Sequence, residues 1–404
     1  MKYLVILGDG MADYPVPELG DKTPLQAAFK PNIDYLAARG ILGMAKTVPE
    51  GMPPGSDTAN LSAMGYDPKV YYSGRSPLEA VSMGINMGAE DLSYRCNLVT
   101  LSDDEPYEQK TMLDYSAGEI TTAEAHELIA ALKEQLDSEL LTLYPGISYR
   151  HCLLRRQNEA GTRLVPPHDI TNKKISEYLP DGVFGEQLLN LMKRSYEILK
   201  NHPVNQKREA RGLNPANSAW FWGEGKKPAL KPFKAEYGLD GAVISAVDLI
   251  KGIALCAAMQ SIDVAGATGT IDTNFTGKAD AGIKALLGGK QFLYLHLEAP
   301  DECGHHYQIE GKKRAIELID QLVVGPVVAA LRAAGEDFRI MVLPDHPTPL
   351  SLRTHTDEPV PFLLYDSTDE KAGGQAFSEQ SAQAAGLYLP QGYKLMSLLT
   401  KGFC

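Results

Sequence analysis

A serine near the start of the chain stands where a nucleophile could attack a bound phosphate. Ser56 follows a loop rich in proline and glycine, EGMPPG (50–55), and precedes a stretch with helical spacing, SDTANLSAMG (56–65). The N-terminus of a helix binds anions through its free N–H groups and its positive dipole end. Two interpretations are open: Ser56 caps the helix, the commoner role of such a serine, or its hydroxyl attacks the phosphate.

A second set of residues offers carboxylates and imidazoles, and each member follows an apolar run or lies close behind one. These candidate metal ligands are Asp9, Asp301, His305, His306, Asp345, His346 and His355. An aspartate after a strand is more often a turn residue, but four of the nine histidines lie between 305 and 355. Carboxylate with imidazole suits Mn, Zn or Fe better than Ca or Mg alone. Two ions about 3.5–4 Å apart can clamp both oxygens of an in-line phosphoryl displacement.

The apolar runs that precede these residues predict the strands of a mostly parallel sheet with helices on both faces. We expect strands at 2–7, 291–299, 338–345 and 359–366, and helices at 29–40 and 310–335. Alternation of strand and helix is typical of an α/β fold. The carboxyl ends of parallel strands meet at one edge of the sheet, where ligands bind. Five distant segments, the Ser56 loop included, should therefore converge there.

The middle of the chain has a different pattern and predicts a second α/β domain inserted into the first. With 404 residues, the chain is long enough for two domains. We expect residues 1–75 and 240–404 to form a catalytic, metal-binding domain and residues 76–239 to form the insert. The prolines, glycines and lysines of 223–241 indicate a linker, after which 241–260 resumes a helical pattern.

The composition limits the partners and the compartment. A net charge of −12 argues against a general nucleic-acid or anionic-membrane surface. No apolar run approaches the roughly 20 residues that cross a bilayer, and the N-terminus lacks a signal-peptide pattern. Five widely spaced cysteines without a C-x-x-C pair are typical of reduced thiols, so the cytoplasm is expected.

Five short motifs carry a resemblance to a known group of enzymes. GDG, GSDTAN, APDECGH, PDH and THT, in this order, resemble the metal-site signature of the alkaline phosphatase superfamily. Within it, the chain resembles the 2,3-bisphosphoglycerate-independent phosphoglycerate mutases, in their shorter form found in archaea and some bacteria. The similarity runs almost end to end and includes YSGRSPLEA, PPHDIT and NPANSAWFWGEGKKP. It implies an alkaline phosphatase-like fold and interconversion of 3- and 2-phosphoglycerate, a step of glycolysis and gluconeogenesis.

The resemblance also implies a role for each candidate ligand. Ser56 resembles the serine that is phosphorylated during the reaction and that also contacts a metal. Asp9, Asp345 and His346 would complete that metal site, and Asp301, His305 and His355 would hold a second ion. The two ions are expected to be Mn, with Zn, Co or Mg as alternatives.

The inserted domain is implied to bind a small phosphorylated acid. His168, in PPHDIT, resembles the histidine that contacts the transferring phosphate, and Asp169 follows it. Bidentate guanidinium contacts suit carboxylates and phosphates. The candidates for the substrate's charged groups are Arg150, Arg155, Arg208 and Arg211, with Lys278 near the metals.

Three rival functions remain open from the sequence. Some proteins of this branch are proposed to be homoserine kinases and share every metal ligand. A plain phosphatase or sulfatase would use the same core, but it would need no large cationic insert to retain a small acid. A metal-binding scaffold without activity is disfavoured because the nucleophile and the full ligand set occur together.

Overall fold

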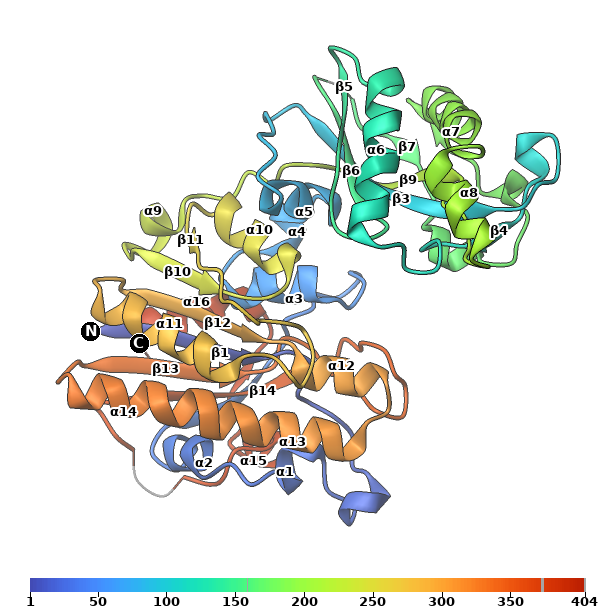
Figure 1. The fold of residues 1–404 in the computed structure, drawn as a ribbon. Helices are drawn as coiled ribbons and strands as arrows, with labels where there is room; N and C mark the ends of the chain where they lie inside the picture. Colours follow the sequence, from blue (N-terminus) through green and yellow to red (C-terminus); the bar gives the residue numbers. More distant parts are fainter. Residues whose placement is uncertain (158, 372–373, 403–404) are drawn as a thin grey trace. The chain divides into compact units, whose positions relative to one another are not determined.

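The computed structural model describes residues 1–157, 159–371 and 374–402. The chain divides into two compact units, Met1–Tyr72 with Leu230–Cys404, and Ser73–Ala229. One unit is therefore inserted into the other, as the colours of Figure 1 show. The borders of the insert expected from the sequence, 76 and 239, lie later in the chain than the observed borders, Ser73 and Ala229. Among the described residues, no helix is both long enough and apolar enough to span a bilayer.

An eight-stranded sheet forms the centre of the first unit, in the order β11-β10-β12-β1-β13-β14-β2-β15. Its strands are β1 (Lys2–Gly8), β2 (Ile41–Ala45), β10 (Gly241–Ile244), β11 (Gln260–Ser261), β12 (Phe292–Leu297), β13 (Phe338–Leu343), β14 (Val360–Asp366) and β15 (Tyr388–Leu389). Only β14 runs antiparallel to its neighbours, β13 and β2. The predicted mostly parallel sheet is confirmed, and its four expected strands are all present.

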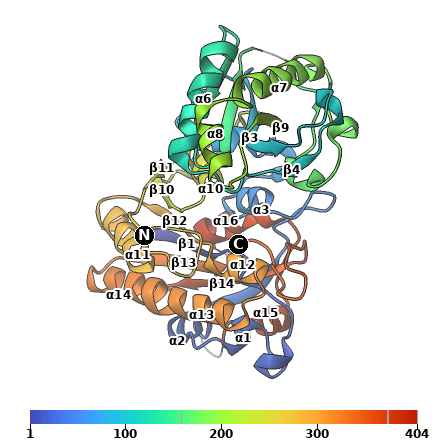
Figure 2. The ribbon, with the colours of Figure 1, turned by 45° about the vertical axis from the view of Figure 1, so that its right-hand side comes forward.

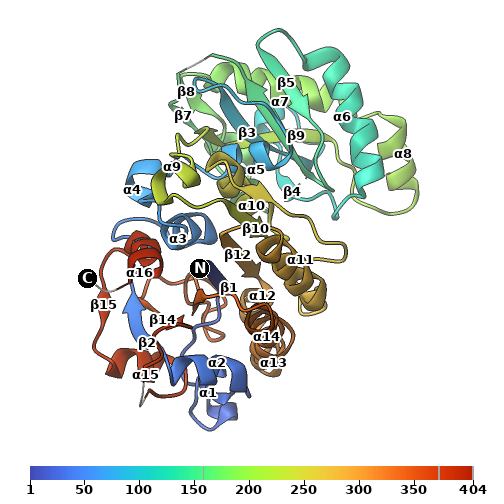
Figure 3. The same ribbon diagram turned by 90° about the vertical axis from the view of Figure 1, so that its left-hand side faces the viewer.

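Helices cover both faces of this sheet. Successive residues of β1 point to opposite faces, and Leu4 to Leu7 are all buried. Leu4 and Ile6 pack in one cluster with α2 (Pro31–Ala37), α11 (Phe275–Leu287), α13 (Ile309–Ile319) and α14 (Gly325–Ala333). Figure 3 shows α11, α13 and α14 on one side of the strands and α3 (Ser56–Ala63) and α16 (Leu395–Lys401) on the other. The remaining helices of this unit are α1 (Pro24–Ala27), α4 (Pro68–Tyr71), α9 (Phe233–Tyr237), α10 (Asp248–Cys256), α12 (Ala299–His305) and α15 (Glu379–Ala384).

Three local predictions differ from the structure. Residues 223–226 are not linker but the end of strand β9 (Ser218–Lys226). The stretch 241–260 begins with strand β10 before α10, since Gly241–Ile244 joins the parallel sheet beside β12. The helix expected at 310–335 contains a π-helical turn, Asp320–Val324, just before Pro326, whose missing N–H cannot make a regular helix bond.

The inserted unit is also α/β, with a five-stranded antiparallel sheet. Its strands are β3 (Leu92–Leu101), β4 (Met112–Asp114), β5 (Leu141–Tyr144), β6 (Arg150–Arg155) and β9. Helices α6 (Thr122–Leu136), α7 (Gly185–Leu199) and α8 (Pro203–Ala210) lie together in Figure 2 and share one apolar core with the sheet. Helix α5 (Ser76–Ser82) contacts β3 and β9, and a short pair, β7 (Thr162–Arg163) and β8 (Asp181–Gly182), completes the unit.

Candidate active site

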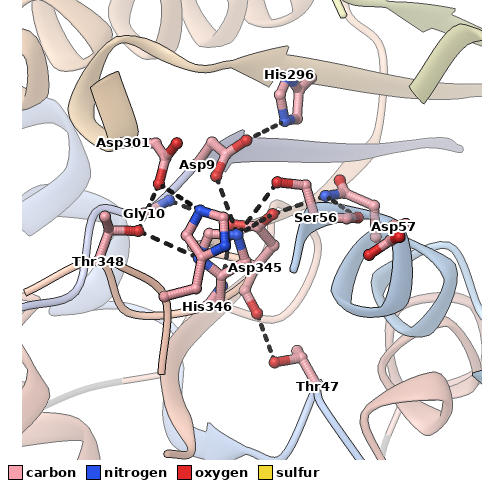
Figure 4. Close-up of polar contacts among 12 residues, drawn as sticks. Asp9, Gly10, Thr47, Ser56, Asp57, His296, Asp301, Asp345, His346 and Thr348 are labelled. Carbon is pink, nitrogen blue, oxygen red and sulfur yellow. Dashed lines mark hydrogen bonds and ion pairs between the residues drawn. The ribbon is translucent and has the colours of Figure 1, made fainter. Parts of the chain in front are cut away.

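Three neighbouring strands end side by side and deliver most of the candidate ligands. Strand β1 lies between β12 and β13 and is parallel to both. Asp9 directly follows β1, Asp301 lies in α12 just after β12, and Asp345 and His346 follow β13. Figure 4 shows their side chains gathered around His346, with Ser56 reaching the same point from α3. The convergence expected from the strand ends is thus present.

Two groups of side chains could each hold a metal ion, and His346 belongs to both. One consists of Asp9, Asp345 and His346, and the other of Asp301, His346 and His355; within each group the ligand atoms lie within 4.8 Å of one another. His346 Nε2 lies 3.5 Å from an oxygen of Asp9 and 3.4 Å from an oxygen of Asp345. The cluster therefore has the donors and the spacing for two ions.

Ser56 lies beside this cluster, and it does not cap its helix. Gly55 occupies the N-cap position and α3 begins at Ser56, so the capping interpretation is not what the structure has. The Ser56 hydroxyl lies 3.2 Å from His346 Nε2. Asn60, one turn along α3, donates from its side chain to the Ser56 carbonyl at 2.9 Å and to Asp345 Oδ2 at 2.7 Å. The start of α3 is thereby fixed relative to Asp345.

Asp301, His305 and His355 form a second compact set. His305 Nε2 lies 3.2 Å from Asp301 Oδ2 and 3.0 Å from His355 Nε2, and His355 Nε2 lies 3.4 Å from Asp301 Oδ1. His305 Nδ1 is 3.0 Å from the carbonyl of Arg353, which requires Nδ1–H as the donor and leaves Nε2 for the cluster. His306 is exposed and pairs with Glu302 at 2.9 Å, so it lies apart from this set.

The electrostatics of the cluster fit bound cations. Burial, followed by the charges of Asp345 and Asp301, raises the pKa of Asp9 well above its usual value. One Asp9 oxygen, Oδ1, is buried and has no hydrogen-bond partner among the described residues, an expensive state for a carboxylate. Burial lowers the pKa of His346, which favours the neutral imidazole that binds metals. A divalent cation would satisfy the unpaired oxygen and offset the repulsion between the carboxylates.

His296 is a residue of this site that the sequence did not single out. It lies in β12, its Nε2 is 2.9 Å from Asp9 Oδ2, and burial lowers its pKa to about 4. Its carbonyl accepts a hydrogen bond from Lys278 at 3.2 Å, and burial lowers the pKa of Lys278 to about 8. Lys278 is fully buried beside His296, and its role in substrate binding stays a prediction. The one available signal for His296 was a histidine inside an apolar strand.

The predicted substrate residues of the inserted unit separate into two sets. His168 lies in a short 3-10 turn, Pro167–Ile170, with its ring 5.3 Å from that of Trp222 and its Nε2 3.7 Å from Asp169. Arg95, not predicted from the sequence, stacks over the same Trp222 ring at 4.1 Å. Burial lowers the pKa of His168; Asp169 opposes the shift, and Arg95 and Arg75 add to it. The guanidinium groups of Arg95 and Arg75 surround this histidine with positive charge, although both also contact Glu79, at 2.9 and 3.1 Å; we call this set the cationic cluster.

Most of the predicted arginines are engaged elsewhere in the unit. Arg208 is buried, and its guanidinium donates to Glu124 Oε2 at 2.6 Å and to the carbonyls of Ala117 and Asn214. Arg211 reaches the other oxygen of Glu124 at 2.7 Å. This geometry favours a structural role for Arg208. Arg155 lies over the ring of Phe184 at 3.7 Å. Arg150 is exposed, and its strand partner is Asn97. The side chain of Asn97 accepts a hydrogen bond from Trp222, the residue that His168 and Arg95 contact. Arg150 therefore remains a candidate substrate ligand beside the cationic cluster.

The chain is similar over its whole length to proteins of one family. A model of the 2,3-bisphosphoglycerate-independent phosphoglycerate mutase family matches residues 37–205. A probable mutase of this name from Geobacter sulfurreducens is 51% identical over 400 residues, 99% of each chain. One from Methanosarcina barkeri is 50% identical over 404 residues, 99% of this chain and 100% of the relative.

Solved structures give the same result for the fold. A protein of Pyrococcus horikoshii superimposes with a TM-score of 0.83 at 28% identity, covering 100% of this chain and 98% of that one. The cofactor-independent phosphoglycerate mutase of Thermoplasma acidophilum superimposes with a TM-score of 0.69 at 26% identity, covering 99% of both chains.

Proposed function

The chain belongs to the family of 2,3-bisphosphoglycerate-independent phosphoglycerate mutases, and from this premise we propose that it interconverts 3- and 2-phosphoglycerate through a phosphate carried on Ser56. The observation that carries the proposal is the position of the Ser56 hydroxyl, 3.2 Å from the histidine that both ligand groups share. Because the phosphoryl group stays bound to the serine between the two transfers, the reaction needs no free bisphosphorylated cofactor.

The residues around Ser56 offer ligands for two divalent ions. We expect these ions to be Mn, with Zn, Co and Mg as alternatives. Asp9, Asp345 and His346, with Ser56 itself, would hold one ion; Asp301, His305 and His355 would hold the other. Bound ions of this kind stabilise charge on a transferring phosphoryl group and favour ionisation of a nearby hydroxyl. The unpaired buried oxygen of Asp9 supports this assignment.

The chemical steps then concern Ser56 and the substrate. The Ser56 oxygen attacks the phosphorus of 3-phosphoglycerate in line with the bond to the C3 oxygen, and that bond breaks. One proton passes from Ser56 to the departing oxygen, which leaves phosphoserine and glycerate. After glycerate reorients, its C2 oxygen attacks the phosphorus of the phosphoserine, and the bond from phosphorus to Ser56 Oγ breaks. The proton of the C2 hydroxyl passes to the Ser56 oxygen. No water is consumed, so water must be kept from the phosphoserine throughout.

We assign retention of glycerate to the cationic side chains of the inserted unit. Arg95 and Arg75 both lower the pKa of His168, and Arg150 is exposed. These three guanidinium groups outnumber the nearby carboxylates of Glu79 and Asp169. Guanidinium groups bind a carboxylate through paired hydrogen bonds. A mutase requires such a clamp because its intermediate is a small, diffusible acid.

An activity assay distinguishes this function from its rivals. Metal-loaded protein with 3-phosphoglycerate, coupled to enolase and without 2,3-bisphosphoglycerate, should form 2-phosphoglycerate. A parallel reaction with ATP and homoserine should form no homoserine phosphate. Phosphorylation of homoserine without mutase turnover would replace the proposal by the kinase, and release of inorganic phosphate alone would replace it by the phosphatase.

Replacing His168 by alanine tests the clamp. Loss of one charge-assisted contact costs about 1.5–3 kcal/mol, so mutase turnover should fall roughly 10- to 100-fold, and the ratio of phosphatase to mutase turnover should rise as water gains access. Both rates are measured on one preparation. Arg208→Ala is the comparison: breaking its pair with Glu124 should lower the melting temperature and leave the ratio unchanged. If the ratio of phosphatase to mutase turnover in His168→Ala equals that of the wild type, His168 does not retain glycerate.

A further inference from the structure

The hydroxyl of Thr348 contacts one member of each proposed metal site. Its oxygen lies 2.5 Å from Asp301 Oδ1 and 3.3 Å from His346 Nδ1, and Figure 4 shows it between the two side chains. A hydroxyl has one hydrogen, and an ionised carboxylate can only accept. Thr348 therefore donates to Asp301 and accepts from His346, which requires the hydrogen of His346 to sit on Nδ1.

This hydrogen-bond chain determines which nitrogen of His346 faces the ligands. With the hydrogen on Nδ1, the lone pair of the neutral ring is on Nε2. Nε2 is the atom that lies 3.2 Å from Ser56 Oγ and 3.5 Å from Asp9 Oδ1. One hydroxyl thus orients a carboxylate of one proposed site, Asp301, and fixes the tautomer of a histidine of the other, His346.

The position of Thr348 is tightly constrained by its surroundings. The buried ammonium of Lys312 donates to the Thr348 carbonyl at 2.8 Å and to Asp13 at 2.7 Å. A Cβ atom on Gly10 would lie 2.5 Å from Thr348 Oγ1, and one on Gly304 would lie 2.6 Å from the Thr348 carbonyl oxygen. Both glycines leave the space that Thr348 occupies, and Gly10 also has a positive φ of 61°.

We propose that Thr348 is a positioning residue that couples the two metal sites, by holding Asp301 and setting the tautomer of His346. The inference rests on the proposed function, because it needs ions at both sites. Outer hydrogen-bond partners of metal ligands typically contribute 10- to 100-fold in metal affinity, since they fix the orientation and basicity of the ligand. In the described part of the chain, the Thr348 hydroxyl hydrogen-bonds to neither the nucleophile nor any other proposed ligand.

The test compares metal affinity in three variants of the full-length protein. Thr348→Val keeps the shape and removes the hydroxyl, whereas Thr348→Ser keeps the hydroxyl. Thr58→Val is the matched control, because Thr58 is also buried in this unit and its hydroxyl has no hydrogen-bond partner within 1–157, 159–371 and 374–402. Mn²⁺ is titrated into metal-stripped protein by calorimetry, and the melting temperature is measured without metal.

We expect Thr348→Val to bind Mn²⁺ roughly 10- to 100-fold more weakly, at both sites, while Thr348→Ser and Thr58→Val bind like the wild type. The metal-free melting temperatures of Thr348→Val and Thr58→Val should be alike. Unchanged affinity in Thr348→Val, an equal loss in Thr348→Ser, or an equal loss in Thr58→Val would each overturn the proposal. Wild-type protein that binds no Mn²⁺ would overturn the proposed metal sites as well, so the two failures are distinguishable.

A second measurement needs no variant. Nitrogen-15 spectra of histidine-labelled, metal-free wild type separate the two neutral tautomers. His346 should carry its hydrogen on Nδ1, and a hydrogen on Nε2 would contradict the coupling.

Discussion

Ser56→Ala should abolish mutase turnover, lowering the rate by roughly 10⁴-fold or more, as removal of a covalent nucleophile generally does. The fold and the ligand groups should persist. Asn60 binds the backbone carbonyl of residue 56 and the carboxylate of Asp345, and neither contact uses the hydroxyl that is lost. Steady-state rates from the enolase-coupled assay measure the loss.

Mass spectrometry after incubation with substrate should find phosphate on Ser56 in the wild type. Ser62→Ala supplies the matched control: it lies in the same helix, but its hydroxyl bonds only to the carbonyl of Thr47 among the described residues. That variant should still be phosphorylated on Ser56. Phosphate on a histidine, or measurable turnover in Ser56→Ala beyond trace level, would contradict the nucleophile assignment.

Removal of metal should have an effect of similar size. EDTA should eliminate turnover, and Mn²⁺, or Co²⁺ or Zn²⁺, should restore it, because the seven proposed ligands are oxygen and nitrogen donors without a thiolate. Metal at about 100 times its dissociation constant should also stabilise the folded state by about 2.7 kcal/mol. Thermal unfolding with and without Mn²⁺ measures this. Full activity in fully stripped protein would refute the two-metal proposal.

Two adjacent histidines give this prediction a control within the chain. His305 is directed at Asp301 and His355, whereas the exposed His306 pairs with Glu302. His305→Ala should lose one of two bound Mn²⁺ ions, and His306→Ala should retain both. Metal content after dialysis decides between them; an equal loss in both variants would mean that the second site is built differently.

The sequence was sufficient for the residues that follow strands. Asp9, Asp301 and Asp345 could be predicted because each follows an apolar run, and parallel strands end at one edge of a sheet. His296 and Thr348 could not be, since their roles depend on which strand lies beside which and on distances of about 3 Å. Nothing in the local pattern reveals that His296 in β12 faces Asp9 after β1.

Residue type alone was not sufficient to assign roles in the inserted unit. Arg208 looked like a substrate ligand, but its partner, Glu124, is far away in sequence and visible only in the fold. The glycines of 223–226 suggested a linker, whereas Gly225 lies within a strand where a Cβ atom would be 2.3 Å from the carbonyl of Ser73. A glycine demanded by close packing and one that marks a flexible connection are identical in sequence.

The nesting of one unit inside the other sets the order in which a ribosome can complete this enzyme. Strand β1 is synthesised long before β12 and β13, the strands with which it pairs in the described part of the chain, so Tyr3 must wait for Phe292. At about 5–20 residues per second, roughly 290 residues take about 15–60 s. The inserted unit is contiguous and is synthesised whole within that interval. Nascent β1 and the Ser56 loop therefore remain without the central strands until β12 and β13 have been made, and we expect a product truncated before β12 to carry no phosphate on Ser56.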